Sequence, residues 1–238
     1  MNSIEISVVL PCYNEQDNMI PLITEITQAL KPLNKNHEII CVNDGSTDDT
    51  YKILTQNKTQ FPEIKIITFT ENNGLTAALD CGFKKARGKI IIMCDADMQN
   101  DPADMPKLIK ALESFDAAYG WRKNRQDTFK KRISSKIANN FRRMITKDKI
   151  HDVGCGLKAF KKECVSSIKL FDGLHRFIPI LIELNGYSST QIEVNHRHRF
   201  KGTSKYSVAN RLFKSIYDLI AVKWMIKRHF TYKEKSDE

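Results

Sequence analysis

Short apolar runs rich in β-branched residues recur along the first half of the chain, each followed by a segment with apolar residues three or four positions apart. Such runs are typical of buried strands, and the wider spacing is typical of amphipathic helices. Strand–helix alternation with short connections favours a Rossmann-like, mostly parallel α/β sheet. The pattern predicts strands at 4–10, 37–42, 64–69, 90–94 and 117–119, and helices at 18–30, between Gly74 and Ala86, and at 101–114.

The second half is less regular and more polar. It predicts helices at 129–145, 177–184 and 208–229, and a strand at 191–195. The last helix has a broad apolar surface interrupted by lysines and arginines, as in helices that lie in a membrane interface. Packing of this helix on the domain core is an equally open interpretation.

Polar residues follow the predicted strands directly, at 11–15, 43–48, 72–74 and 95–99. Because ligands of open α/β sheets bind beyond the carboxyl ends of the strands, these segments predict the ligand site. Ser46 or Thr47 is expected to cap the helix that follows the second strand.

Two carboxylates one residue apart, Asp95 and Asp97, follow the fourth strand. In extended structure residues i and i+2 project to one side, so the pair can share a divalent cation that in turn holds a diphosphate. The alternative is structural: Asp97 ends the strand and caps the helix that begins near Asp101.

Charge divides the chain into two unlike halves within a net charge of +10. Residues 1–119 hold 11 Lys and Arg against 17 Asp and Glu, a net of −6, whereas 120–238 hold 27 against 11, a net of +16. The basic half suits phosphates, anionic lipid or nucleic acid, although a solvated surface would have the same charge.

Composition excludes several classes of protein. The 41% apolar content is that of an ordinary folded domain, and no apolar run approaches the ~18 residues of a membrane-spanning helix. Six scattered cysteines without a C-x-x-C pair indicate a reducing compartment. The first strand is not followed by G-x-G-x-x-G, and no G-x-x-x-x-G-K-[ST] occurs, which argues against dinucleotide enzymes and P-loop NTPases.

The motifs taken together resemble one family. Those of the first half are similar to family 2 glycosyltransferases of GT-A fold, and stand at Val9–Glu15, Asn43–Asp48, Asn73–Gly74 and Asp95–Gln99. Those of the second half resemble the polyprenyl-phosphate branch, which includes dolichol-phosphate mannosyltransferases and undecaprenyl-phosphate glycosyltransferases. They are Gly120–Arg122, Arg125–Asp127, Ser135 with Asn139, Asp152–Lys158, and Arg199-x-x-Gly202-x-Ser204-Lys205-Tyr206.

The resemblance implies a nucleotide-sugar donor, GDP-mannose or a UDP-sugar. Tyr13 would give the base a flat apolar wall, and Asp44 would accept hydrogen bonds from base N–H groups. The implied donor-binding residues are Pro11, Tyr13, Glu15, Asp44, Asp95 and Asp97, and the implied ligands of Mg²⁺ or Mn²⁺ are Asp95, Asp97 and Gln99. The structural alternatives are a strand terminator for Pro11, a helix N-terminal charge for Glu15 and a turn residue for Asp44.

It also implies a polyprenyl phosphate as acceptor, with one direct displacement that inverts the anomeric carbon. A phosphate monoester, with a second pKa near ~6, is already largely dianionic and needs orientation more than deprotonation. Arginine suits this because its planar fork meets phosphate oxygens bidentately. The implied acceptor residues are Arg122, Lys131, Ser135, Arg199 and Ser204, and the implied catalytic residues are Asp97, Arg122, Arg199 and Lys205.

The predicted GT-A domain spans 1–206, with a donor half at 1–119 and an acceptor half at 120–206; 207–230 form the amphipathic helix and 231–238 a tail. Bacterial members of the branch often carry two transmembrane helices after the region matching Tyr206 to Trp224, where this sequence stops. We therefore expect a cytoplasmic protein, peripheral on the cytosolic face of a membrane, whose last helix lies on the bilayer or docks on a separate membrane subunit. A homo-oligomer is left open.

Two other functions compete with this one. A family 2 glycosyltransferase acting on a glycan or protein hydroxyl would need a carboxylate base near its acceptor, which the basic acceptor region argues against. A non-catalytic binder of nucleic acid or anionic membrane would give no role to Asp44, Asp95 or Asp97. Nucleic acid is not an expected partner, since RNA-binding aromatic motifs are absent.

Overall fold

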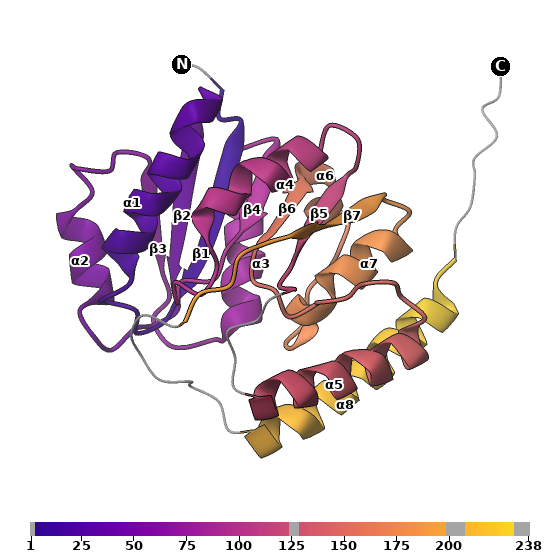
Figure 1. The fold of residues 1–238 in the computed structure, drawn as a ribbon. Coiled ribbons are helices and arrows are strands. Elements are labelled where there is room, and N and C mark those ends of the chain that lie inside the picture. Colours follow the sequence, from indigo (N-terminus) through magenta and orange to yellow (C-terminus); the bar gives the residue numbers. More distant parts are fainter. Residues whose placement is uncertain (1–2, 124–128, 199–207, 231–238) are drawn as a thin grey trace.

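A seven-stranded sheet runs through the described residues of the computed structural model, which are 3–123, 129–198 and 208–230, without the side chains of 129–136 and 208–213. Figure 1 shows helices on both of its faces. The strands lie in the order β3-β2-β1-β4-β6-β5-β7. Their bounds are β1 (Ile6–Cys12), β2 (His37–Asn43), β3 (Ile64–Thr68), β4 (Ile90–Met93), β5 (Ala117–Trp121), β6 (Lys158–Lys161) and β7 (Ser189–Glu193).

The helices divide between the two faces. One hydrophobic cluster holds apolar residues of α1, α2 and α4, and the other holds those of α3, α6, α7 and α8. The α-helices are α1 (Met19–Leu30), α2 (Thr50–Gln56), α3 (Leu75–Lys85), α4 (Met105–Ala111), α5 (Phe129–Thr146), α6 (Lys162–Ser166), α7 (Ile178–Leu184) and α8 (Val208–Arg228). Short 3₁₀ turns are η1 (Lys31–Leu33), η2 (Pro102–Asp104) and η3 (Leu174–Phe177).

Side-chain alternation explains this division. In β1, Val8 and Leu10 face the α1 side while Val9 faces the α3 side, and all three are fully buried. A strand buried on both faces reads as the continuous apolar run from which it was predicted.

The prediction of a mostly parallel sheet is confirmed. β1 pairs in parallel with β2 and β4, β2 with β3, and β5 with β7. β6 was not predicted; it runs antiparallel between β4 and β5. Its four residues, Lys-Ala-Phe-Lys, are too short and too charged to give a strand signal.

Several predicted boundaries were wrong, including that of the strand predicted at 191–195, which is β7 (Ser189–Glu193). β1 continues through Pro11 to Cys12, which the sheet tolerates because β4 ends opposite Val9 and leaves one side of Pro11 without a ladder partner. The residue at the N-cap of α2 is Asp49, not Ser46 or Thr47. The helix predicted at 101–114 divides into η2 and a shorter α4.

Helices α5 and α8 lie side by side next to the edge at which β1 ends (Figure 1). α8 packs on the domain through Leu219 and Val222, which are buried in the same cluster as α3 and α7. Arg176 of η3 donates a hydrogen bond to Ser215 of α8.

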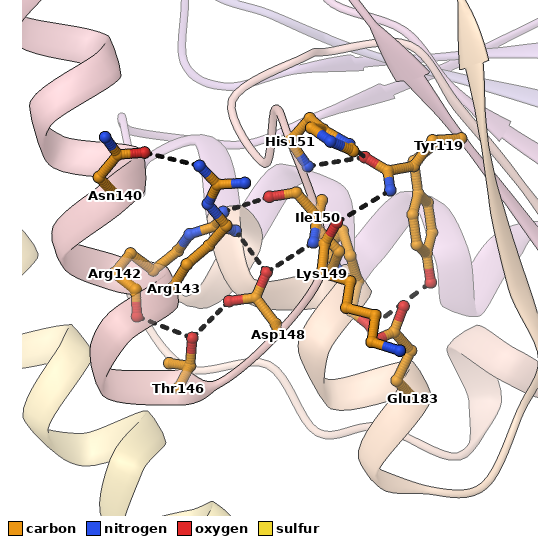
Figure 2. A network of polar contacts seen from close by, with 12 residues as sticks. Tyr119, Asn140, Arg142, Arg143, Thr146, Asp148, Lys149, Ile150, His151 and Glu183 are labelled. Atoms are coloured by element: carbon orange, nitrogen blue, oxygen red, sulfur yellow. Dashed lines mark hydrogen bonds and ion pairs between the residues drawn. The ribbon is translucent and has the colours of Figure 1, made fainter.

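A buried ion pair fixes the C-terminal end of α5 (Figure 2). Arg142 lies 3.2 Å from the Asp148 carboxylate, and both side chains are at most 5% exposed. Arg142 also donates to the Ile150 carbonyl at 2.5 Å, and Thr146 donates to Asp148. The segment that leads from α5 towards β6 is thereby held against the helix.

Candidate functional site

The strands β1, β2, β4 and β5 all run in one direction, so their carboxyl ends meet at one edge of the sheet. The residues that follow them include Tyr13, Asp44, Asp95 and Arg122. The structure therefore brings the predicted donor residues and one predicted acceptor residue to the same edge, where ligands of such sheets bind.

Asp44 organises the loop that precedes α3. Its carboxylate accepts from the Asn73 backbone N–H at 2.7 Å, from the Gly74 N–H at 2.9 Å and from the Asn72 side-chain amide at 2.9 Å. Burial raises the pKa of this carboxyl, and the two backbone donors oppose that rise. Three donors occupy most of its roughly four acceptor positions, so little capacity is left for a ligand.

Glycine is required beside this carboxylate. Gly45 has φ of +64°, and a Cβ there would lie 2.6 Å from the Asn72 nitrogen. Its αL conformation and the close approach of the next loop together exclude a side chain.

The loop after β1 is tied to the loop after β2. The Asn14 N–H donates to Ser46 Oγ at 2.9 Å, and the Thr47 N–H donates to Asn14 Oδ1 at 2.8 Å. Of the predicted base-binding residues, Pro11 is buried in β1, and Tyr13 and Glu15 are half-buried in this double loop. Glu15 also accepts from Asn18 at 2.6 Å, which gives it a structural contact at the start of α1.

The prediction that strand alternation places Asp95 and Asp97 on one side was wrong. β4 ends at Met93, Asp97 lies in a turn, and Met98 has φ of +62°. Both carboxylates are half-buried, and Asp97 accepts the Gln99 N–H at 3.1 Å. The pair thus remains at the edge of the sheet, on a turn and not on the strand itself.

Arg122 makes a bidentate ion pair with Asp152, from Nε at 2.7 Å and from Nη2 at 2.9 Å. The two side chains are 11% and 6% exposed. Burial lowers the pKa of the guanidinium, but the hydrogen bonds and charge of Asp152 outweigh it and raise the pKa above its usual value. The sequence motif that contains Asp152 gave no role to this residue. Its pairing with Arg122 joins residues thirty positions apart, so no local pattern indicates it.

The segment 152–158 connects the two sets of residues. Its start holds Arg122 through Asp152, and Gly156 packs against the Asp95 carboxylate. At its end, the buried Lys158 amino group donates to the Cys155 carbonyl. This connection could not be predicted from spacing alone.

The other predicted acceptor residues lie outside the described part of the chain. Only the backbone is described for Lys131 and Ser135, and Arg199, Ser204 and Lys205 fall within 199–207. Their roles stay predictions.

Most of the large apolar side chains that the described residues expose lie on the α5–α8 pair. Of the ten large apolar side chains that the described residues expose, seven lie on these two helices. They are Ile137, Phe141 and Met144 of α5 and Ile216, Tyr217, Ile220 and Trp224 of α8. Within the described chain, no helix combines the length and hydrophobicity that crossing a bilayer needs.

Comparison with known proteins gives matches in sequence and in fold. Residues 7–168 match the profile of Glycosyl transferase family 2. A dodecaprenyl-phosphate galacturonate synthase of Rhizobium johnstonii is 37% identical over 235 residues, which are 95% of this chain and 69% of that protein.

Two solved structures have a similar fold. Glucosyl-3-phosphoglycerate synthase from Mycobacterium tuberculosis, in complex with Mn²⁺, UDP and glucosyl-3-phosphoglycerate, has a TM-score of 0.69 at 18% identity, over 94% of this chain and 80% of that one. A mannosyltransferase from Pyrobaculum calidifontis, in complex with GDP-Man and Mn²⁺, has a TM-score of 0.65 at 20% identity, over 93% and 64%. At identities this low, the similarity establishes the fold alone. The two structural matches confirm the predicted glycosyltransferase fold.

The profile covers more than half of the chain, and the Rhizobium relative aligns with nearly all of it. The sequence motifs, the sheet and the residues at its edge are consistent with both matches. The chain belongs to glycosyl transferase family 2.

Proposed function

We propose that this glycosyltransferase moves a sugar from a UDP- or GDP-sugar to a polyprenyl phosphate at the cytosolic surface of a membrane, with inversion at the anomeric carbon. The observation that carries the proposal is the segment 152–158, which contacts Asp95 on the donor side and holds Arg122 on the acceptor side. The 37% identical relative, a dodecaprenyl-phosphate galacturonate synthase, supports this acceptor class.

A divalent cation fits the donor residues. Among the side chains that the structure describes, no group of three or more His, Cys, Asp or Glu could hold a metal by itself. Mg²⁺ in phosphate-transfer sites is typically held by one or two carboxylates, with phosphate oxygens and water completing the shell. Asp95 and Asp97, with the Gln99 amide, match that pattern, and the cation would neutralise charge on the leaving diphosphate.

Arg122 would orient the acceptor phosphate. Asp152 takes the Nε and Nη2 sides of its guanidinium and fixes the plane of the group, so the Nη1 side is the one that would meet a phosphate oxygen. Because the Asp152 carboxylate is paired with the Arg122 guanidinium, it is a poor candidate for a general base. A dianionic phosphate needs no base, whereas a hydroxyl acceptor does.

The apolar surface of α5 and α8 would bring the enzyme to its lipid acceptor. Exposed lysines and an arginine, Lys214, Lys223, Lys227 and Arg228, accompany the seven apolar side chains of α5 and α8. Exposed apolar residues together with basic residues on the same helix suit an anionic membrane surface or a membrane subunit. The helix pair lies at the edge at which the site lies, so a bilayer there would present the phosphate to Arg122 (Figure 1).

Transfer is tested with purified protein, labelled UDP- and GDP-sugars, Mn²⁺ or Mg²⁺, and vesicles with or without polyprenyl phosphate. We expect labelled lipid only with one nucleotide class, the cation and the polyprenyl phosphate together. Transfer to a soluble glycan or peptide hydroxyl, with none to the lipid, would support the hydroxyl-acceptor alternative and refute the proposal.

Membrane contact is tested by co-sedimentation with anionic vesicles that lack polyprenol. Trp224→Glu should weaken binding, because Trp224 is 64% exposed on the apolar surface. Tyr51→Glu is the matched control, since Tyr51 is 50% exposed on α2. If Trp224→Glu binds vesicles as the wild type does, α8 is not a lipid contact, and reconstitution with a membrane subunit becomes the relevant experiment.

A further inference from the structure

Gly156 lies directly against the carboxylate of Asp95. A methyl group on its Cα would overlap Oδ2 and Cγ of Asp95 and would lie 2.8 Å from the Asn100 side-chain nitrogen. Its φ is outside the left-handed range, so φ gives no reason for glycine at this position. The requirement for glycine here comes from two neighbouring side chains, the Asp95 carboxylate first and the Asn100 amide second.

Gly154, two residues earlier, differs in this respect. A Cβ there would lie 3.4 Å from Arg122 Nη2 and 3.6 Å from Asp152 Oδ1. The first distance is at the border of ordinary van der Waals contact and the second is within it. The same loop therefore offers one glycine that a methyl group would disturb strongly and one that it would disturb little.

Lys158 holds the peptide that carries Gly156. It is 1% exposed, pairs with Met93 of β4 and Tyr119 of β5, and donates from its amino group to the Cys155 carbonyl. Burial lowers the pKa of this lysine, and the nearby Asp95 and Asp152 charges oppose that effect. Removing an amine from water is costly, so a lysine buried next to the site is expected to have a role that offsets this cost.

We propose that Gly156 and Lys158 are positioning residues: the bare Cα of Gly156 seats the Asp95 carboxylate, and Lys158 anchors the Cys155–Gly156 peptide that forms this seat. The inference rests on the proposed function, in which Asp95 engages the donor and its cation. Groups that orient metal-binding carboxylates commonly change metal affinity about 10–100-fold when altered. The same segment begins at Asp152, which pairs with Arg122, so the seat also fixes the Asp95 carboxylate relative to the Arg122 guanidinium.

The test measures binding of UDP and GDP by titration calorimetry, with and without Mn²⁺, alongside the melting temperature. Gly156→Ala should weaken the Mn²⁺-dependent part of nucleotide binding about ten-fold or more. Gly154→Ala should leave it within about two-fold, since its methyl group meets no donor residue. Equal affinities in Gly156→Ala and the wild type would overturn the inference.

Lys158→Met keeps the apolar stem and removes the donor to Cys155. We expect it to weaken Mn²⁺-dependent binding in the same direction, whereas Lys161→Met, on the same strand at the far end of β6, should not. Lys161 pairs with Asp116 at 2.9 Å and has no contact with the site. An effect of equal size in both lysine variants would show a general loss of stability and would overturn the role of Lys158.

A folding defect in Gly156→Ala is also informative. If the methyl group clashes with the Asp95 carboxylate, Gly156→Ala should lower the melting temperature much less in an Asp95→Ala background than in the wild type, where only the Asn100 contact would remain unrelieved. Failure of this rescue would refute the seat. Absence of any Mn²⁺-dependent nucleotide binding in the wild type would instead refute the proposed function, so the two failures are distinguishable.

Discussion

Asp44 is predicted to have a structural role of its own, apart from the role in donor binding that the family resemblance implies. Asp44→Ala removes the acceptor of three N–H groups, two of them on the backbone at the start of α3. A hydrogen bond to a charged group contributes about 1.5–3 kcal/mol, but Asn72 and Asn73 are exposed and water can replace part of the loss. We therefore expect a loss of about 3 kcal/mol in the free energy of unfolding, which lowers the Tm by about 6–12 °C in a domain of this size.

The assay is thermal unfolding followed by far-UV circular dichroism, with nucleotide binding measured on the same samples. Asp80→Ala is the control: Asp80 makes only an exposed i,i+4 ion pair with Lys84, so its loss should cost less than about 0.5 kcal/mol. A Tm for Asp44→Ala equal to that of Asp80→Ala would refute the structural role. Asp44 would then act on the ligand alone.

Three further predictions address other parts of the chain. Asp97→Ala should lower transfer by about 10³-fold or more with little change in Tm, because several kcal/mol of charge stabilisation is lost; near-normal turnover would remove Asp97 from the site. Asp116→Asn should lower the free energy of unfolding at pH 7 by about 1 kcal/mol, since Lys161 and Ser188 lower the pKa of Asp116 from 3.8 to about 2. That difference should shrink as the pH falls from 3.8 towards 2, where the native carboxylate also becomes protonated; a difference at pH 2 as large as at pH 7 would contradict the ion pair as its cause. Arg142→Met should lower the free energy of unfolding in urea by about 3–5 kcal/mol, because it leaves the Asp148 carboxylate buried without its cation. Asp148→Asn in the same chain should recover part of this loss. A loss below about 1 kcal/mol would mean that the pair of Figure 2 is not buried in solution.

The sequence predicted those parts of the fold whose signal is local. A strand such as β1, buried on both faces, must be apolar throughout, so its existence follows from its composition. The acidic pair Asp95 and Asp97 was predicted at the edge because it follows such a strand. The sequence of β6 has no comparable signal, because a lysine does not indicate a buried strand. Lys158 is buried only because the folded chain supplies a hydrogen-bond partner for its amino group.

Long-range pairs in the site also had no local signal. Asp152 lies thirty residues from Arg122, and the donors to Asp44 lie in a loop of a different strand. Such pairs depend on the connections between strands, which the sequence specifies only through the folded sheet. The roles of Arg199, Ser204 and Lys205 remain predictions of the resemblance, because they lie outside the described residues.

The contacts of α8 determine which experiment can test membrane binding. Thr76, in the first turn of α3, contacts His175 at 2.7 Å and accepts the Gly173 N–H at 3.1 Å. Gly173 in turn lies against Asp218 of α8. α3 begins at the loop that Asp44 holds, so removing α8 would disturb a chain of contacts that reaches the donor site. Deletion from Val208 would lose membrane binding and donor binding together, and could not assign either to the helix surface. Substitutions on the exposed side, such as Trp224→Glu, leave the buried Leu219 and Val222 in place and separate the two effects.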